Sequence, residues 1–345
     1  YNYSHERSIS MRLGILGAGM IVKDFLKITD QLSQYELSGI CGTEAEHNTL
    51  EKLQYDYHIK NIYTDYDEML SSDCEIIYIG VPNHLHYQFA KKAILQGKNV
   101  IIEKPIVINE TEFNDLYNLA DQKHVYVFEA ITNQYSPNYR KIKELLPKLG
   151  PIHIVNMNYS QYSSRFDSFK QGIILPAFDY TKAGGSLMDL NIYNLHFVVG
   201  IFGKPDDVMY YPNISKNIDT SGIAILKYPD FVCSCIASKD SRAQCTNLIQ
   251  GENGYIIMNS PANVCESFEI HIKGEKPQII DERKYSHRMI DEFIAFEKMI
   301  TLKDNSSYSL FKEESRLVCS VQTELRKKTN IIFPGDLLAK GEDSQ

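Results

Sequence analysis

The sequence has no tryptophan among its 345 residues, no basic tract and no long apolar run. A membrane-spanning helix needs about 20 consecutive apolar residues, so the short runs exclude one. The net charge is −8, and an acidic chain without a basic patch binds nucleic acid poorly. The missing tryptophan leaves little protein emission to mask that of a fluorescent ligand. What remains is an ordinary globular chain, long enough for two domains.

The seven cysteines form neither a metal nor a disulfide pattern. Cys233 and Cys235 make a C-x-C pair, but in a strand their side chains share one face, and no Cys/His pair lies nearby at metal spacing. We therefore expect buried free thiols, no metal site, and a reducing compartment, the cytoplasm. Residues 1–10 are polar and lack the apolar core of a signal peptide. Because Met11 resembles a natural start, we expect these ten residues to be a tag or a disordered extension.

Strand-like and helix-like segments alternate from residue 11 to residue 130. The expected strands are 11–16, 35–41, 62–63, 75–81, 99–103 and 125–128. The expected helices are 20–32, 44–57, 66–71, 84–96 and 109–123. This alternation predicts an α/β domain over residues 11–130, with a doubly wound parallel sheet covered by helices on both faces.

Beyond residue 130 strand-like runs follow one another with few helices between them. The expected strands are 152–162, 222–228, 231–238, 245–250, 255–259 and 268–273, and the expected helices are 137–146, 186–202, 288–302 and 310–327. Such an order predicts a mostly antiparallel open sheet. We expect residues 131–345 to form an α+β domain that binds substrate and mediates dimerisation.

The first expected strand ends in a glycine turn, in the run LGILGAG over residues 13–19. Gly17 would make a tight turn, and Gly19 would let the backbone approach a pyrophosphate at the N-terminus of the following helix. The pattern is incomplete, because Val22 stands where a dinucleotide fingerprint has glycine or alanine. Many glycine turns in α/β proteins bind nothing, so this motif needs support from the other strand ends.

Polar or special residues follow several other strands, where a parallel sheet binds its ligands. Asn83 and His86 would cap a helix and contact a cofactor, although simple capping by Asn83 gives the same pattern. The candidate cofactor-binding residues are Gly17, Gly19, Met20, Ile21, Gly42, Thr43, Val81, Pro82, Asn83, His86, Glu103 and Lys104.

Lys104, in the run Glu-Lys-Pro after the fifth strand, is a candidate proton donor. Near a cofactor the pKa of a lysine can fall toward neutrality, and such a group can protonate a substrate oxygen. A solvated lysine at the start of a loop has the same sequence pattern. Arg165 either reaches a substrate or lies on the surface of a loop.

A second cluster follows Gly184-Gly185, where Asp189 and Tyr193 stand four residues apart on an expected helix, so they share a face. His196 would share that side. A carboxylate beside a tyrosine can orient a substrate hydroxyl or tune a proton donor. The same pattern is also expected if Asp189 is stabilised only by the helix dipole and Tyr193 is a core residue.

These motifs occur in the order and spacing of one family. The runs GILGAGMI (14–21), VPNHLH (81–86), VIIEKP (100–105) and GGSLMDLNIY (184–193) resemble those of the glucose–fructose oxidoreductase / inositol dehydrogenase / MocA (Gfo/Idh/MocA) family. The resemblance implies an N-terminal Rossmann domain and a C-terminal domain whose open sheet often forms dimers. It also implies that Lys104 lies near the nicotinamide and the substrate oxygen, that Asp189 holds substrate, and that Tyr193 is the acid/base.

Within that family the chain is closer to the dihydrodiol / xylose dehydrogenase branch. Tyr193 together with the run Phe128-Glu-Ala130 supports this placement. That branch has aromatic and basic residues just after Glu-Ala, whereas this chain has Thr132, Asn133 and Gln134, which leaves the substrate open.

The function that we expect is NAD(P)-dependent hydride transfer at a hydroxyl or carbonyl carbon of a sugar, polyol or related small alcohol, with Lys104, Tyr193 and Asp189 as catalytic residues. NAD is favoured over NADP, because residues 40–47 contain no lysine or arginine, whereas Glu44 and Glu46 would repel a 2′-phosphate. A homodimer or homotetramer would form through the C-terminal sheet. The alternatives are a cofactor-binding regulator without turnover, or a hydrolase or lyase that retains its cofactor.

Overall fold

The structure is a computed structural model that describes residues 10–338. Its first sheet is parallel, with the strand order β3-β2-β1-β4-β5-β6. The strands are β1 (Met11–Leu16), β2 (Tyr35–Cys41), β3 (Asn61–Tyr63), β4 (Ile76–Ile79), β5 (Asn99–Glu103) and β6 (Val127–Ala130). The winding of the chain reverses between β1 and β4, and a doubly wound sheet binds its ligand beyond the carboxyl ends of its strands at such a point.

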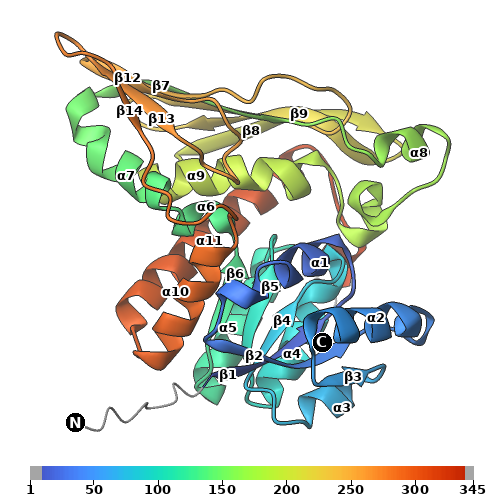
Figure 1. The fold of residues 1–345 in the computed structure, drawn as a ribbon. Coiled ribbons are helices and arrows are strands. Elements are labelled where there is room, and N and C mark those ends of the chain that lie inside the picture. The colour runs from blue at the N-terminus through green and yellow to red at the C-terminus, as the bar shows by residue number, and fades with distance from the viewer. Residues whose placement is uncertain (1–9, 339–345) are drawn as a thin grey trace, which may run out of the picture.

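Helices connect these strands and lie on both faces of the sheet (Figure 1). They are α1 (Met20–Leu26), α2 (His47–Tyr57), α3 (Tyr66–Leu70), α4 (His86–Leu95) and α5 (Glu110–Lys123). The predicted fold class is confirmed, and β1, β2 and β5 have the predicted bounds. The first helix is shorter than predicted, because the chain turns into a 3-10 segment, Thr29–Gln31, where the Thr29 hydroxyl donates to the Leu26 carbonyl at 2.9 Å. Residues 1–9 of the expected extension lie outside the described residues.

The second sheet has the strand order β14-β13-β12-β11-β7-β10-β9-β8, and every pair is antiparallel except β7 with β10. Its strands are β7 (Ile152–Ser160), β8 (Asp207–Ser215), β9 (Ile218–Lys227), β10 (Val232–Ser238), β11 (Asn247–Gly251), β12 (Gly254–Met258), β13 (Phe268–Ile272) and β14 (Gln278–Ile280). The mostly antiparallel sheet is therefore as predicted. Both edge strands, β8 and β14, escaped prediction, and β8 carries Pro212, which favours an edge position over a central one.

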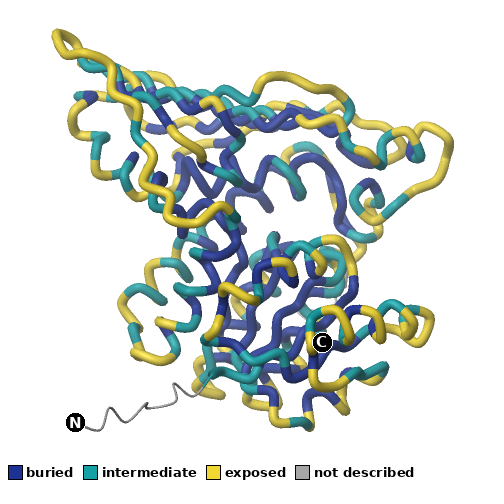
Figure 2. The backbone as a smooth tube through the Cα atoms, in the orientation of Figure 1, coloured by how far each residue is buried: buried dark blue, intermediate teal, exposed yellow. Residues whose placement is uncertain are grey.

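The remaining helices are α6 (Thr132–Tyr135), α7 (Pro137–Leu145), α8 (Phe166–Lys170), α9 (Ile192–Phe202), α10 (Ile290–Thr301), α11 (Asn305–Lys328) and α12 (Pro334–Leu338). Helix α9 lies under one face of the second sheet, and no helix within residues 10–338 covers the other face (Figure 1). Buried backbone fills the centre of both lobes (Figure 2). No helix within residues 10–338 is both long enough and apolar enough to span a membrane.

After the second sheet the chain returns to the first. Phe293 on α10 stacks on Phe25 with ring centroids 4.4 Å apart, and its carbonyl accepts the Tyr35 hydroxyl at 2.8 Å. Phe296 stacks on Phe128 at 4.8 Å. We propose that the first domain ends at residue 130 in the sequence. Helix α10 then belongs to the second domain and packs against the first.

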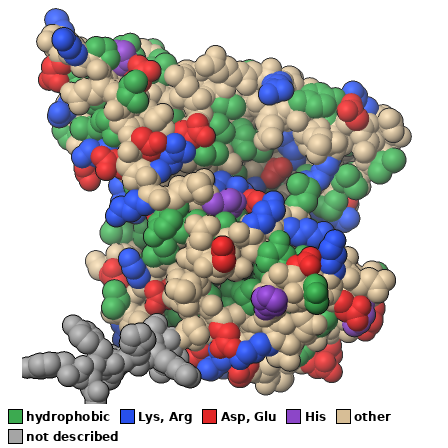
Figure 3. All heavy atoms as spheres, in the orientation of Figure 1, with side chains coloured by type: hydrophobic (Ala, Val, Ile, Leu, Met, Phe, Trp, Pro, Cys, Tyr) green, Lys and Arg blue, Asp and Glu red, His purple; other side chains and the backbone are tan. Residues whose placement is uncertain are grey.

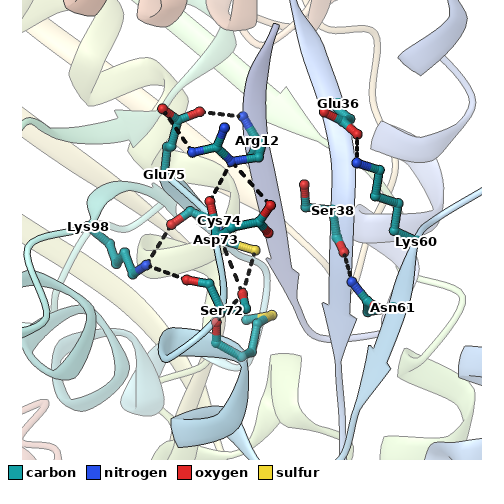
Figure 4. Close-up of polar contacts among 11 residues, drawn as sticks. Arg12, Glu36, Ser38, Lys60, Asn61, Ser72, Asp73, Cys74, Glu75 and Lys98 are labelled. Atoms are coloured by element: carbon teal, nitrogen blue, oxygen red, sulfur yellow. Dashed lines mark hydrogen bonds and ion pairs between the residues drawn. The ribbon is translucent and has the colours of Figure 1, made fainter.

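Polar contacts join the segments at the amino ends of the central strands β1, β4 and β5 (Figure 4). The Arg12 Nε donates to the Asp73 carbonyl at 2.7 Å, and the Arg12 backbone amide donates to Glu75 at 3.0 Å. Lys98 donates to the Cys74 carbonyl at 2.7 Å. These contacts lie at the end of the sheet opposite to the candidate ligand site, so they serve stability.

Candidate active site

The glycine turn after β1 has room for a ligand. Gly17 has φ +113°, and a Cβ there would lie 2.6 Å from the Gly80 carbonyl oxygen, so only glycine fits. Gly19 is exposed, and a Cβ on it would meet no atom within 4 Å. Helix α1 has no acidic residue in its first turn and no side-chain cap, so its first amides are available to an anion. The turn therefore fits a pyrophosphate group.

Val22 fits at the third fingerprint position because the facing residue is small. Val22 is fully buried, and a Cβ on Gly80 would lie 2.6 Å from its Cγ2. The close approach of helix and strand, which the fingerprint obtains from a small residue on the helix, is obtained here from a glycine on the strand side. The incomplete motif is thus compatible with the usual geometry.

The loop after β4 contacts the second lobe through a hydrogen bond. We expected the Asn83 side chain to cap a helix, but it does not. Its Nδ2 donates instead to the Ala183 carbonyl at 2.8 Å. His86 is a correction, because it is fully buried and its ring nitrogens lie 2.8 Å from the carbonyl oxygens of Pro105 and Val81. His86 therefore holds two loops together and does not reach the cleft.

The turn after β2 is fixed by its own acidic residue. The Glu46 carboxylate accepts the backbone amide and the hydroxyl of Thr43, both at 2.9 Å. The Glu44 carboxylate accepts the Thr64 hydroxyl at 2.6 Å. Gly42, at the start of the turn, donates its amide to the Tyr63 carbonyl at 3.1 Å. Two carboxylates thus stand at the strand end where a dinucleotide places its adenosine ribose.

Lys104 follows β5 and reaches across to the second lobe. Its Nζ lies 2.8 Å from the Asp189 Oδ1, 2.8 Å from the Asp189 carbonyl and 5.0 Å from the centroid of the Tyr193 ring. Burial lowers the pKa of Lys104, but the Asp189 carboxylate outweighs burial and raises the pKa above its ordinary value. This corrects our expectation of a depressed pKa. Lys104 is therefore an ammonium, and its pairing with Asp189 holds the proton on it.

The expected contact between Glu103 and a cofactor also needs correction. Its side chain is buried and accepts the Tyr78 hydroxyl at 2.7 Å. It therefore points into the sheet, away from the space that Lys104 faces, and does not contact a cofactor in the cleft.

Asp189 lies between two lysines. Its Oδ1 faces Lys104, and its Oδ2 accepts a hydrogen bond from the Nζ of Lys239 at 2.8 Å. Burial raises the pKa of Asp189, but the two ammonium groups outweigh it and hold the pKa well below its usual range. Lys239 escaped the sequence reasoning. Its only signal was that, like Lys104, it directly follows a strand.

The helix that carries Asp189 begins irregularly. Leu187–Asn191 form a π-helical turn before α9. The Asp219 Oδ2 accepts the Leu187 amide at 2.7 Å and the Tyr210 hydroxyl at 2.7 Å. Gly185, at φ +107°, leaves room for that carboxylate, since a Cβ there would meet the Asp219 Oδ1. The turn is thus held by a buried acid from β9.

Tyr193 faces the same space as Lys104. Burial raises the pKa of Tyr193, and the nearby Lys104 opposes this only in part, so Tyr193 is a neutral hydroxyl. That hydroxyl makes no hydrogen bond with any residue in the described range, which leaves it available to a ligand. His196, expected on the same side, lies in the core, 3.3 Å from Glu129 and 2.8 Å from Gln134.

The residues that depart from the dihydrodiol branch are buried. Thr132 donates its hydroxyl to the Asn263 carbonyl at 2.6 Å, and Asn133 donates to the Tyr193 carbonyl at 2.9 Å. Arg165, from the loop before α8, reaches the other lobe, where its guanidinium lies 2.9 Å from the Met20 Sδ beside the glycine turn. Figure 3 shows the surface hollowed between the two lobes, with charged side chains along the hollow.

Residues 11–131 match a family model described as an oxidoreductase family with an NAD-binding Rossmann fold. The scyllo-inositol 2-dehydrogenase (NADP(+)) IolU of Bacillus subtilis (strain 168) is 30% identical over 331 residues, which cover 94% of this chain and 99% of that protein. The trans-1,2-dihydrobenzene-1,2-diol dehydrogenase of Mus musculus is 25% identical over 346 residues, which cover 95% and 99% of the two chains.

Solved structures share the whole fold. Levoglucosan dehydrogenase in complex with NADH and levoglucosan superposes with a TM-score of 0.79 at 15% identity, over 93% of this chain and 97% of that chain. KijD10, a 3-ketoreductase from Actinomadura kijaniata in complex with NADP, gives 0.77 at 15% identity, over 92% and 97%. At these identities the likeness concerns the fold alone.

Proposed function

The chain belongs to the Gfo/Idh/MocA family of NAD(P)-dependent oxidoreductases, and we propose that it moves hydride between a nicotinamide and a hydroxyl-bearing carbon of a sugar, polyol or related small alcohol. Membership confirms the resemblance drawn from the motifs. The proposed substrate class is supported by the two curated relatives, which are named as dehydrogenases of an inositol and of a dihydrodiol.

One observation carries this proposal. Lys104 from the first lobe meets Asp189 and Tyr193 from the second, beside the end of the parallel sheet where a dinucleotide binds. Hydride transfer to or from an alcohol carbon needs a group that exchanges a proton with the substrate oxygen, and an ammonium and a free phenolic hydroxyl beside a carboxylate can serve this purpose.

The residues fit a dinucleotide along the sheet edge. Gly17, Gly19 and the amides of Met20 and Ile21 would hold the pyrophosphate. Gly42 and Thr43 would face the adenosine ribose, and Val81, Pro82 and Asn83 would lie along the nicotinamide half. Arg165 reaches Met20 from the other lobe, so it would approach the same phosphates.

When bound, the nicotinamide supplies the hydride acceptor or donor. In reduction, Lys104 and Tyr193 share the delivery of a proton to the carbonyl oxygen while the carbonyl carbon gains hydride. In oxidation, the pair first gives one proton to solvent and then receives the proton of the substrate hydroxyl while the carbon loses hydride, so the net products are a carbonyl compound and one released proton. Asp189 fixes the ammonium and, being partly exposed, can accept a hydrogen bond from a substrate hydroxyl.

NAD(H) is the proposed preference over NADP(H). The carboxylates of Glu44 and Glu46 are held in place at the end of β2 by Thr64 and Thr43. A 2′-phosphate brought to this strand end would meet like charges. The family itself does not decide the matter, since the curated Bacillus relative is named for NADP(+).

A homodimer or homotetramer through the bare face of the second sheet is also proposed. Ile154, Tyr211, Ile223 and Val232 lie on four adjacent strands of this sheet and are 41–63% exposed. An apolar face of this kind usually marks an interface. All seven cysteines are free and six are buried, which supports a reducing compartment such as the cytoplasm.

The proposed function is tested by incubating the protein with NAD+ and with NADP+ against a panel of inositols, aldoses and dihydrodiols. We expect at least one compound to give a stoichiometric rise in reduced nicotinamide and an equal amount of oxidised product, a ketone or, from an aldose oxidised at its anomeric carbon, a lactone. Binding of cofactor with no turnover by any panel member would favour a regulator. Conversion of a substrate without net cofactor reduction would favour a cofactor-retaining hydrolase or lyase.

A further inference from the structure

Lys239 is almost completely buried in the second lobe. It directly follows β10, and its side chain is 2% exposed. Its Nζ donates to the Ala177 carbonyl at 2.6 Å and to the Asp189 Oδ2 at 2.8 Å, and it lies 4.4 Å from the centroid of the Phe178 ring. A buried ammonium is costly unless it is paired, so Asp189 is the partner that makes this position possible.

The two lysines bind different oxygens of the Asp189 carboxylate. Lys104 occupies the Asp189 Oδ1 and Lys239 occupies the Oδ2, each at 2.8 Å. No other cation in the described part of the chain lies within 4 Å of this carboxylate. Lys239 donates its backbone amide to the Thr220 carbonyl at 2.8 Å, and its own carbonyl accepts the Ser163 amide at 2.9 Å. The second cation is thus fixed in place by the sheet.

Proton loss from Lys104 has different consequences with and without this second cation. If Asp189 had only Lys104, loss of the proton would leave a largely shielded carboxylate, 31% exposed, without a compensating charge, which is unfavourable. With Lys239 present, loss of the proton leaves a complete ion pair between Asp189 and Lys239. The three groups together then carry one positive charge before the substrate takes the proton and none afterwards, whereas without Lys239 the pair would go from neutral to negative.

We infer that Lys239 is a positioning residue for catalysis, which keeps the charge of Asp189 compensated when Lys104 gives its proton to the substrate oxygen and so allows Lys104 to act as the proton donor. This inference rests on the proposed function for its catalytic meaning. Its physical content, the easier release of the proton from Lys104, does not depend on any substrate.

Other titratable groups face Lys104 but none supplies this compensation. They are Asp189 and Tyr193 from the second lobe, Glu103 on β5, Tyr159 on β7 and His86 on α4. The carboxyl groups cannot carry a positive charge, and the tyrosines are neutral or negative. The ring nitrogens of His86 are occupied by carbonyl oxygens. Asp219 lies near Lys239, but it is bound to Leu187 and Tyr210.

The first test measures the amine of Lys104 without cofactor or substrate. The apo protein is labelled at about pH 9 with limiting acetic anhydride, and acetylation of Lys104 relative to surface lysines is read by mass spectrometry. In Lys239→Met, Lys104 becomes the sole partner of Asp189 and should react about tenfold more slowly, as expected for a pKa change of about one unit from a neighbouring charge. Lys239→Gln is the second variant if Lys239→Met does not fold, because its amide can still donate to Ala177.

Lys216 offers a matched control. It also donates to a backbone carbonyl, that of Phe169, and its Nζ lies 4.6 Å from the Phe169 ring centroid, but it pairs with no carboxylate among the residues that the structure describes. Lys216→Met should therefore leave the reactivity of Lys104 within twofold of the unchanged protein. Lys239→Arg keeps the charge and should also leave it close to the original value.

The second test follows turnover on a substrate found by the panel. In Lys239→Met the pH at half-maximal kcat for alcohol oxidation should rise by about one unit, while KM changes less than kcat. A loss of activity or of melting temperature without a change in Lys104 reactivity or in this pH would show a purely structural lysine and overturn the inference. If the unchanged protein converts none of the compounds, and Lys239→Met still slows the labelling of Lys104, the proposed function is refuted. The charge compensation by Lys239 is then still supported.

Discussion

The ammonium of Lys104 lies 2.8 Å from the carboxylate of Asp189, although the two residues are 85 positions apart in the chain. The contact joins the end of β5 to the π-helical turn before α9, and with them the two lobes. Its side chains are 13% and 31% exposed, so a ligand in the cleft reaches both. A pair that is shielded but still accessible is suited to proton exchange with a substrate.

Tyr193→Phe should lower kcat by about 10² to 10⁴ and change cofactor affinity by less than twofold. The hydroxyl takes part in proton transfer, which contributes about that factor, and within residues 10–338 it makes no hydrogen bond whose loss would destabilise the fold. The measurement is kcat beside a titration with reduced cofactor. Tyr159→Phe is the control, because its ring lies 6.0 Å from that of Tyr193 and its hydroxyl bonds Gln161 instead. Equal losses in both variants would contradict the role of Tyr193.

Gly80→Ala should destabilise the protein by about 1–3 kcal/mol through overpacking and should weaken cofactor binding. The added methyl would lie 2.6 Å from the Val22 Cγ2. Val22→Ala removes that atom, so the double variant Val22→Ala/Gly80→Ala should recover part of the loss. Urea unfolding of the four proteins in this cycle gives the interaction energy, which we expect to be about 1–2 kcal/mol. Additive losses would show that the two residues do not depend on each other.

Asp219 makes stability fall as pH rises. Burial raises its pKa from 3.8 to about 6, against the hydrogen bonds from Leu187 and Tyr210. The folded state therefore holds the proton more tightly than the unfolded state, so Asp219 contributes stability below about pH 4 that is lost by about pH 6. Relative to Asp219→Asn, the unfolding free energy should fall by about 3 kcal/mol over this range.

Urea unfolding at several pH values between 4 and 7 checks this, with Asp230→Asn at an exposed turn as the control. The control should stay parallel to the unchanged protein. A difference between the protein and Asp219→Asn that does not change with pH would mean that Asp219 is already ionised throughout.

NADH should bind about tenfold more tightly than NADPH, which corresponds to about 1.4 kcal/mol. The cause is repulsion of the 2′-phosphate by Glu44 and Glu46. Because the chain has no tryptophan, emission of the reduced cofactor can be titrated directly. Glu44→Arg should narrow or reverse the preference, and the exposed Glu51→Arg on α2 should change it less. A preference for NADPH in the unchanged protein would contradict the assignment.

The strands that the sequence predicts best are those whose limits are local. β1 and β5 have apolar centres, and β2 ends in the short run Ile40-Cys41 before Gly42, so local composition marks the bounds of all three. β8 is an edge strand with alternating burial and a proline, and such a strand is defined by its pairing with β9, which no local pattern records.

The site was predictable where it lies at the ends of parallel strands, as Lys104 does. Lys239 could not be found in this way, because its pairing with Asp189 depends on how β10 packs against the turn before α9. His196 was misplaced for a related reason. Every residue from Ile192 to Val199 is buried, so the apolar pattern does not reveal which face of α9 meets the cleft.

The most direct test of the account compares Lys104→Met with the unchanged protein on the best substrate of the panel, by reduction of cofactor and by titration with NADH. We expect kcat to fall by about 10² or more, while the dissociation constant of NADH stays within twofold. Full activity in Lys104→Met, or failure of the unchanged protein to bind either reduced cofactor at concentrations above tens of micromolar, would contradict the account.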